Sequence, residues 1–158
     1  MAFHDDLLGQ AFHLTDRDPE TQADLRRAIS SAYYALFHLL ISETIANWGL
    51  DSSRGNLARM FEHSLMKRVS KRIIDPKQCP FRREDQIVVG NLRDVAKRFI
   101  QLQDNRHIAD YDGTVVWTKT DALDEVRKAE LAFRAWLSIR HSKIAQDYLV
   151  SLLIKPRD

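Results

Sequence analysis

The chain is poor in the residues that interrupt or cross-link regular structure. Among its 158 residues there are only five Gly, four Pro and one Cys. So few turn-forming residues argue against a fold of many strands joined by tight turns. The single cysteine, Cys79, excludes an internal disulfide and a metal site built from several cysteines.

Long hydrophobic runs are missing as well. Nowhere do about 18 apolar residues follow one another, so we expect no membrane-spanning helix. The first residues, Met1 to Asp6, lack the basic and apolar regions of a secretory signal. We therefore expect a cytoplasmic protein with no membrane partner.

What the chain does contain suits a helical protein. Apolar residues make up 44% of the sequence and charged residues 29%. The length matches that of one typical domain, and no repeat, low-complexity tract or linker divides it. We predict a single domain over residues 1–158.

Apolar residues recur at intervals of three and four, which is the spacing of amphipathic helices. A short helix is predicted over residues 7–14, and longer ones over 20–48, 55–73, 83–110 and 120–154. Asp18 is the expected N-cap of the 20–48 helix, with Pro19 in its first turn. The apolar face of that helix is so wide that it should be the central one. The predicted fold class is all-α, an up-and-down bundle of four long helices plus a short N-terminal helix.

Positive charge is concentrated in the middle of the chain. Residues 52–83 hold nine basic and two acidic residues, whereas residues 1–51 hold three basic and eight acidic ones. Such a block can attract a polyanion, although a solvated helix face has the same composition. Only two aromatic residues, Phe61 and Phe81, fall within it, so it does not predict a stacking platform for bases. The candidate nucleic-acid-binding residues are Arg54, Arg59, Lys67, Arg68, Lys71 and Arg72.

Conventional enzyme and metal signatures are missing. The sequence has no Gly-rich phosphate loop, no G-x-S-x-G elbow and no H-E-x-x-H motif. None of the six histidines has another three or four positions away, so no helix presents a pair of imidazoles to a metal. We predict no metal site and no cofactor.

Two segments carry the residues best able to take part in binding or catalysis. The first, residues 26–38, reads R-R-A-I-S-S-A-Y-Y-A-L-F-H on the central helix. Its small residues permit close approach of a neighbouring helix, and Tyr33, Tyr34 and His38 bring polar groups inward. Tight core packing with hydrogen-bonded tyrosines explains the same pattern without any catalytic role.

The second segment, residues 105–112, reads N-R-H-I-A-D-Y-D at the end of the 83–110 helix. Arg106 faces Asp110 at i,i+4, and His107 faces both Asp110 and Tyr111. A guanidinium beside an imidazole and a phenol can bind and polarise a phosphodiester. An intrahelical salt bridge that closes a helix end is the simpler reading.

In combination, the two segments resemble the HEPN family, especially its small stand-alone prokaryotic members. The shared features are a central-helix motif from Arg27 to His38 and, about 70 residues later, an R-x-x-A-D-Y-like motif from Arg106 to Tyr111. The resemblance covers roughly residues 20–145. It implies a bundle of four to five helices, usually a homodimer in which the arginine motifs of the two subunits meet near the two-fold axis.

The resemblance also implies an RNA-related function. Many HEPN proteins are metal-independent ribonucleases, often toxins of toxin–antitoxin pairs or defence effectors, and others pair with a small nucleotidyltransferase. In catalytic members a histidine follows the arginine after four to six residues. Here Arg106 fits the first position, but Tyr111, Asp112 and Gly113 occupy the window and no histidine falls in it.

Proton transfer would therefore need another residue, because a tyrosine near pKa 10 is almost entirely protonated at pH 7. We expect Arg106 to bind the scissile phosphate, with Asp110 and Tyr111 orienting it. His107 and His38 are the candidates for proton transfer, and His63 can approach only through tertiary packing. A non-catalytic interaction module partnering a nucleotidyltransferase is the main alternative, and an accidental resemblance is the other.

Overall fold

The computed structural model describes residues 2–154, and over that range the chain is helical with no strand. The all-α prediction is confirmed. The elements in chain order are α1 (Phe3–Thr15), α2 (Gln22–Ala46), a short 3₁₀ helix η1 (Asp51–Ser53), α3 (Arg54–Ala58), α4 (His63–Ile74), α5 (Gln86–Tyr111), α6 (Lys119–Ile139) and α7 (Lys143–Ser151).

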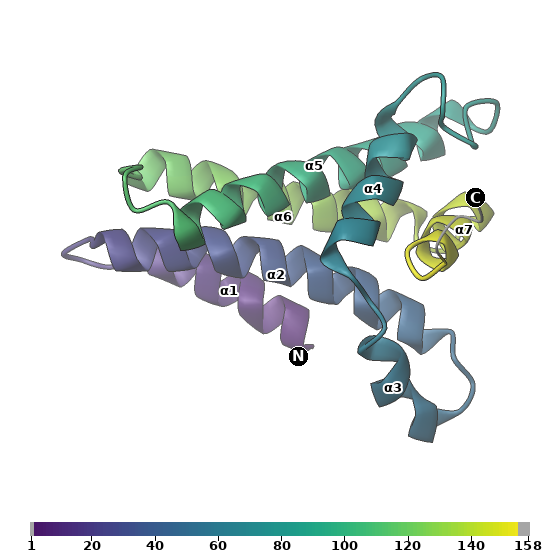
Figure 1. Ribbon diagram of the computed structural model, residues 1–158, viewed down its shortest axis with the longest axis horizontal. Helices are drawn as coiled ribbons and strands as arrows, with labels where there is room; N and C mark the ends of the chain where they lie inside the picture. The colour runs from purple at the N-terminus through teal and green to yellow at the C-terminus, as the bar shows by residue number, and fades with distance from the viewer. Residues whose placement is uncertain (1, 155–158) are drawn as a thin grey trace.

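Helix α2 is the central element, as its apolar pattern predicts. It packs against α1, α5, α6 and α7, and 14 of its 25 residues are buried. Figure 1 shows α1, α2, α5 and α6 lying lengthwise, with α4 crossing them steeply and α7 near one end. The small residues Ala28, Ala32 and Ala35 are fully buried, which lets neighbouring helices approach the α2 backbone closely.

A large hydrophobic core joins these helices, and a smaller cluster lies beside it between α2, α5 and α6. The buried members of the large core come from α1, α2, α4, α5, α6 and α7, and Tyr33, Phe99, Trp136 and Tyr148 are among its largest side chains. Each helix contributes a stripe spaced three to four residues apart, so the pattern read from the sequence is the pattern that is buried. Among residues 2–154, no helix combines the length and apolarity needed to cross a membrane.

The predicted helix over residues 55–73 is wrong as one element. The chain leaves helical geometry between Ala58 and His63, which separates α3 from α4. At this break Phe61 is 8% exposed and joins the core, whereas Met60 is 63% exposed. No Gly or Pro marks the break, so tertiary packing overrides a locally continuous helical pattern.

The predicted helix over residues 120–154 is also wrong as one element. Helix α6 ends at Ile139, and α7 begins after Ser142, whose hydroxyl accepts a hydrogen bond from the Ala145 amide at 3.2 Å. Ser142 is therefore an N-cap, a role for which serine is well suited. In its described range the structure has three helices of more than 20 residues, α2, α5 and α6.

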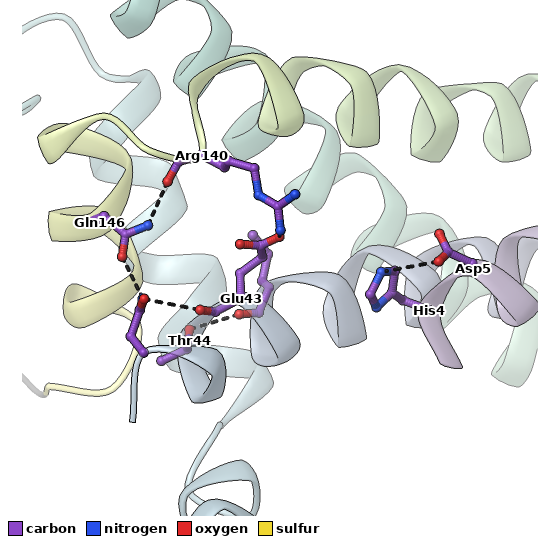
Figure 2. A network of polar contacts seen from close by, with 8 residues as sticks. His4, Asp5, Glu43, Thr44, Arg140 and Gln146 are labelled. Atoms are coloured by element: carbon purple, nitrogen blue, oxygen red, sulfur yellow. Dashed lines mark hydrogen bonds and ion pairs between the residues drawn. The ribbon is translucent and has the colours of Figure 1, made fainter. Parts of the chain in front are cut away.

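A polar network holds the corner between α6 and α7 against the end of α2. Arg140 donates to Glu43 of α2, and Gln146 donates to the Arg140 carbonyl at 2.6 Å. Figure 2 shows these side chains converging from the two segments. The Asn47 amide then donates to Gln146 Oε1 at 2.6 Å. The corner is fixed by contacts between residues almost 100 positions apart, which a sequence pattern does not report.

Helix caps explain the remaining differences in helix ends. The N-cap of α2 is Thr21, whose hydroxyl accepts from the Asp24 amide, so the predicted Asp18 cap is wrong. Helix α6 begins with a capping box in which Thr118 and Asp121 bond each other's backbone amides. Residue 120, where the 120–154 helix is predicted to begin, is the second residue of α6. Such shifts are small because several adjacent residues are capable caps.

Candidate functional site

Arg106 lies on the face of α5 that packs against α2. Its guanidinium carbon is 5.2 Å from the centre of the Tyr33 ring and 5.7 Å from that of Tyr34. It forms an ion pair with Asp110 at 3.6 Å, as the i,i+4 spacing predicts, and its side chain is only 12% exposed. The two tyrosine faces attract and orient the cation, so the predicted phosphate-binding residue is held firmly between the two motifs.

The arginine retains unused hydrogen-bonding capacity. Its Nε is buried and has no hydrogen-bond partner within the described part of the chain. A guanidinium carries five N–H donors in a rigid fork, and the ion pair with Asp110 engages only part of it. The Nε–H is therefore an unsatisfied donor inside the protein.

His63 is brought to the same cluster by the break before α4. It is the first residue of that helix, and its Nδ1 lies 2.5 Å from the Tyr33 hydroxyl. Its ring stacks on Phe37 with 4.3 Å between centroids. Sequence reasoning did not place His63 among the site residues, because it lies 30 positions from Tyr33 and 43 from Arg106 with no local spacing to connect them.

The surroundings of this pair determine where its protons reside. Burial raises the pKa of Tyr33 well above its usual value, so its hydroxyl stays protonated and is able to donate to His63 Nδ1. Burial first, and then the positive charge of Arg106, lower the pKa of His63. At neutral pH His63 is therefore neutral, and where the Tyr33 hydroxyl donates to Nδ1 the imidazole proton is on Nε2. Its Nε2–H is an oriented donor.

His38 lies further along α2 and is half-buried. Its ring packs edge-on against Phe3, with 4.8 Å between centroids. The Tyr34 ring centroid lies 6.4 Å from that of His38 and 6.1 Å from that of His63. Burial, followed by the nearby His4, lowers the pKa of His38. Within residues 2–154 its ring nitrogens make no hydrogen bond, so a neutral His38 can accept a proton.

The remaining residues of the second motif point in different directions. Asp110 pairs with Arg106 and also accepts from Ser30 of α2 at 3.4 Å. His107 is exposed, and its ring lies 4.9 Å from that of Tyr111, which is 72% exposed. His107 thus lies beside Tyr111 and also lines a surface pocket with Arg106.

Arg26 secures the end of α5, a role that sequence reasoning did not assign. Its guanidinium donates to the carbonyls of Ala109 at 2.9 Å and Asp112 at 2.8 Å, and also to that of Val115. Carbonyls at a helix C-terminus lack intrahelical partners and carry partial negative charge. Arg26 satisfies them and so holds Asp110 and Tyr111 in place.

The basic block is distributed over two helices. Arg54 donates to the Trp48 carbonyl and pairs with Asp51, and Arg59 donates to Asn56 Oδ1, so both are engaged near α3. On α4, Lys67 forms an ion pair with Asp104. The other three predicted residues also lie on α4. Arg68 and Lys71 are exposed, and Arg72 is half-buried.

Three surface pockets surround the cluster. One of about 460 Å³ lies between α2 and the end of α5, where Arg27, Ser30, Tyr34, Asp110 and Tyr111 line it. A second of about 330 Å³ shares Arg27, Ser30 and Tyr34 with it and extends to His38 and Phe3. The third, of about 510 Å³, lies between α4 and α5 and is lined by Lys67, Arg106 and His107.

An apolar pocket at the other end of α2 contains none of the predicted site residues. Trp48, Leu57, Val150 and Leu153 are among the side chains lining its volume of about 330 Å³. Across the described range, no three His, Cys, Asp or Glu side chains come together in a way that could hold a metal ion. The side chains present at the Arg106 cluster are the arginine, two tyrosines, His63 and the Asp110 carboxylate.

Comparisons with known proteins give the chain no relative. No family model matches it, and neither a curated protein nor a solved structure does.

Proposed function

We propose that this chain is a HEPN-like, homodimeric domain with an RNA-related site, acting as a metal-independent ribonuclease of toxin or defence type in the cytoplasm. The observation that carries the proposal is the position of Arg106, held on the faces of Tyr33 and Tyr34 beside Asp110, with two imidazoles close to the same tyrosines. The proposed topology is up-and-down, with α2, α5 and α6 among the long helices of the bundle and α1 as the short N-terminal helix.

Cleavage of RNA without a metal requires a cation for the phosphate and groups that move protons. A base removes the proton of the 2′-hydroxyl, the 2′-oxygen attacks phosphorus, and the 5′-oxygen leaves with a proton from an acid. In this proposal Arg106 binds the phosphate, and Asp110 and Tyr111 orient it.

Of the two predicted proton-transfer residues, His38 is favoured over His107. The lowered pKa of His38 keeps it neutral and able to accept a proton at pH 7, whereas His107 is directed toward Tyr111. His63 adds an Nε2–H donor for the phosphate. The cluster thus contains an imidazole from a different helix where the family's motif histidine is missing.

The test is cleavage of several single-stranded RNAs by purified protein in EDTA, alongside Arg106→Ala and Arg106→Lys. Wild type should cleave. Arg106→Ala should lose the activity, and Arg106→Lys should lose most of it, because an ammonium does not reproduce the planar fork. Arg127→Ala, at an exposed position on α6, is the matched control and should keep full activity. Equal activity of wild type and Arg106→Ala would contradict the proposal.

The homodimer is proposed from the resemblance alone, with the arginine motifs near the two-fold axis. Light scattering at micromolar concentration tests it directly. A monomer throughout the micromolar range would contradict this part of the proposal while leaving the cleavage experiment informative.

A specific observation also favours a non-catalytic interaction module that partners a small nucleotidyltransferase. Arg106 is largely buried and already paired with Asp110, which is what a structural staple between α2 and α5 requires. In that case no RNA is cleaved by any variant, and Arg106→Ala lowers thermal stability instead. Co-purification of a nucleotidyltransferase from the native host would then identify the partner.

A further inference from the structure

A continuous polar groove runs along α2, formed by the two pockets that share Arg27, Ser30 and Tyr34. One end reaches Tyr111 at the end of α5, and the other reaches His38 and Phe3. Ala23 and His38 mark its limits on α2, and at 1.5 Å per residue they are roughly 22 Å apart along the helix axis. Such a groove can accommodate several nucleotides of a single strand.

The side chains of this groove combine aromatic faces with an unused cation. Phe3 is 60% exposed and Tyr111 is 72% exposed, and they stand at opposite ends. Arg27 is exposed between them and has no hydrogen bond or ion pair with any described residue. Single-strand binding sites use this combination, because bases of any sequence stack on aromatic rings while cations follow the phosphates.

The groove also passes the proposed reaction site. Tyr34 lines both pockets, and the guanidinium carbon of Arg106 lies 5.7 Å from the centre of its ring. Asp110, the ion-pair partner of Arg106, lines the same groove. Arg106 itself lines the neighbouring pocket between α4 and α5, together with Lys67, so the groove along α2 reaches it only through Tyr34 and Asp110. The exposed residues of the basic block on α4, Arg68 and Lys71, line none of these pockets.

We propose that a single-stranded RNA segment lies in the groove along α2, with bases stacked on Tyr111 and Phe3 and a phosphate on Arg27. This rests on the proposed function for the identity of the ligand and moves the principal binding surface from the basic block to α2. The basic block then contributes only long-range attraction.

The test is fluorescence anisotropy with a labelled 2′-O-methyl oligouridylate of about ten nucleotides, which lacks the attacking hydroxyl and stays intact. Tyr111→Ala and Phe3→Ala should each weaken binding by about 5- to 100-fold, the loss of one base–aromatic stack. Tyr111→Phe keeps the ring and should bind more tightly than Tyr111→Ala. Arg27→Ala should reduce the slope of log affinity against log salt by about 0.7, and Arg27→Lys should restore it.

The double variant Arg68→Ala/Lys71→Ala tests whether the RNA binds to α4 instead. Unchanged binding by Tyr111→Ala together with a large loss in the α4 variant would overturn the inference. So would conversion of a dimer to a monomer by Tyr111→Ala and Phe3→Ala, because the groove would then be a protein interface. Cleavage in EDTA is scored separately, so failure to cleave by a protein that binds through this groove counts against the ribonuclease alone.

Discussion

The Tyr33 hydroxyl and the Nδ1 of His63 lie 2.5 Å apart, joining the middle of α2 to the first residue of α4. The same tyrosine ring supports Arg106 on α5. One residue of the first motif therefore connects three helices, an arginine and an imidazole. A substitution of Tyr33 should therefore alter both the stability of the fold and the positions of Arg106 and His63 in the site.

Replacing Tyr33 with Phe removes this hydrogen bond but keeps the ring. Because His63 Nδ1 is left without its donor in a partly buried place, we expect the free energy of unfolding to fall by about 1–2 kcal/mol in urea titrations. Tyr111→Phe is the matched control, since Tyr111 is exposed, and it should stay within about 0.5 kcal/mol of wild type. A Tyr33→Phe variant as stable as wild type would show that this bond contributes nothing.

The lowered pKa of His38 predicts a stability change with pH. Above about pH 6.5 the residue is neutral in both the folded and unfolded chains and contributes nothing. Below that pH the unfolded chain takes up the proton more readily, so stability falls until the folded pKa is reached. The His38→Gln variant should lose this contribution, and thermal melts at pH 7.5 and 5.5 should show a smaller drop for it than for wild type. Equal drops would contradict the lowered pKa.

Arg26 and Arg27 are adjacent in sequence and should differ sharply in their effect on stability. Arg26 bonds three carbonyls at and beyond the end of α5, so Arg26→Ala should cost about 2 kcal/mol or more. Exposed Arg27 has no partner among the described residues, and Arg27→Ala should change stability by less than about 0.5 kcal/mol. Chemical denaturation of the two variants side by side measures the difference, and similar losses would refute the capping role.

Ser70 and Tyr148 form a buried polar pair suited to a double-mutant cycle. Their hydroxyls are 2.8 Å apart, and both residues are fully buried. Ser70→Ala or Tyr148→Phe alone leaves one buried hydroxyl unsatisfied and should cost about 1–3 kcal/mol. The double variant should cost less than the sum of the single changes, because neither hydroxyl is then orphaned. Strict additivity in urea titrations would show that the hydroxyls are not coupled.

Local features of the fold could be read from the sequence. The 3.6-residue repeat of apolar side chains predicts each helical region, and the i,i+4 spacing predicts the ion pair between Arg106 and Asp110. The central position of α2 follows from the width of its apolar face. These properties depend on residues within a turn or two of one another, so the sequence contains them directly.

The helix breaks could not be read in the same way. Nothing in the residues around Met60 or Arg140 forbids a helix, and the chain turns there because burying Phe61 and bonding Arg140 to Glu43 stabilise the bent path. Both gains come from distant partners. A continuous helical pattern over 55–73 or 120–154 therefore predicts more regular structure than the tertiary contacts permit.

For the candidate site, the sequence by itself determined which chemical groups lie on which helix: Arg106 and Asp110 on α5, and Tyr33, Tyr34 and His38 on α2. Only the tertiary structure decided that His63 bonds Tyr33, that Arg26 closes the end of α5, and that Arg27 lies in an open groove. The physical reason is the separation along the sequence between the residues that make contact. Helix geometry places residues three and four positions apart on one face, whereas contacts across 30 to 90 positions depend on how the loops and breaks direct each helix.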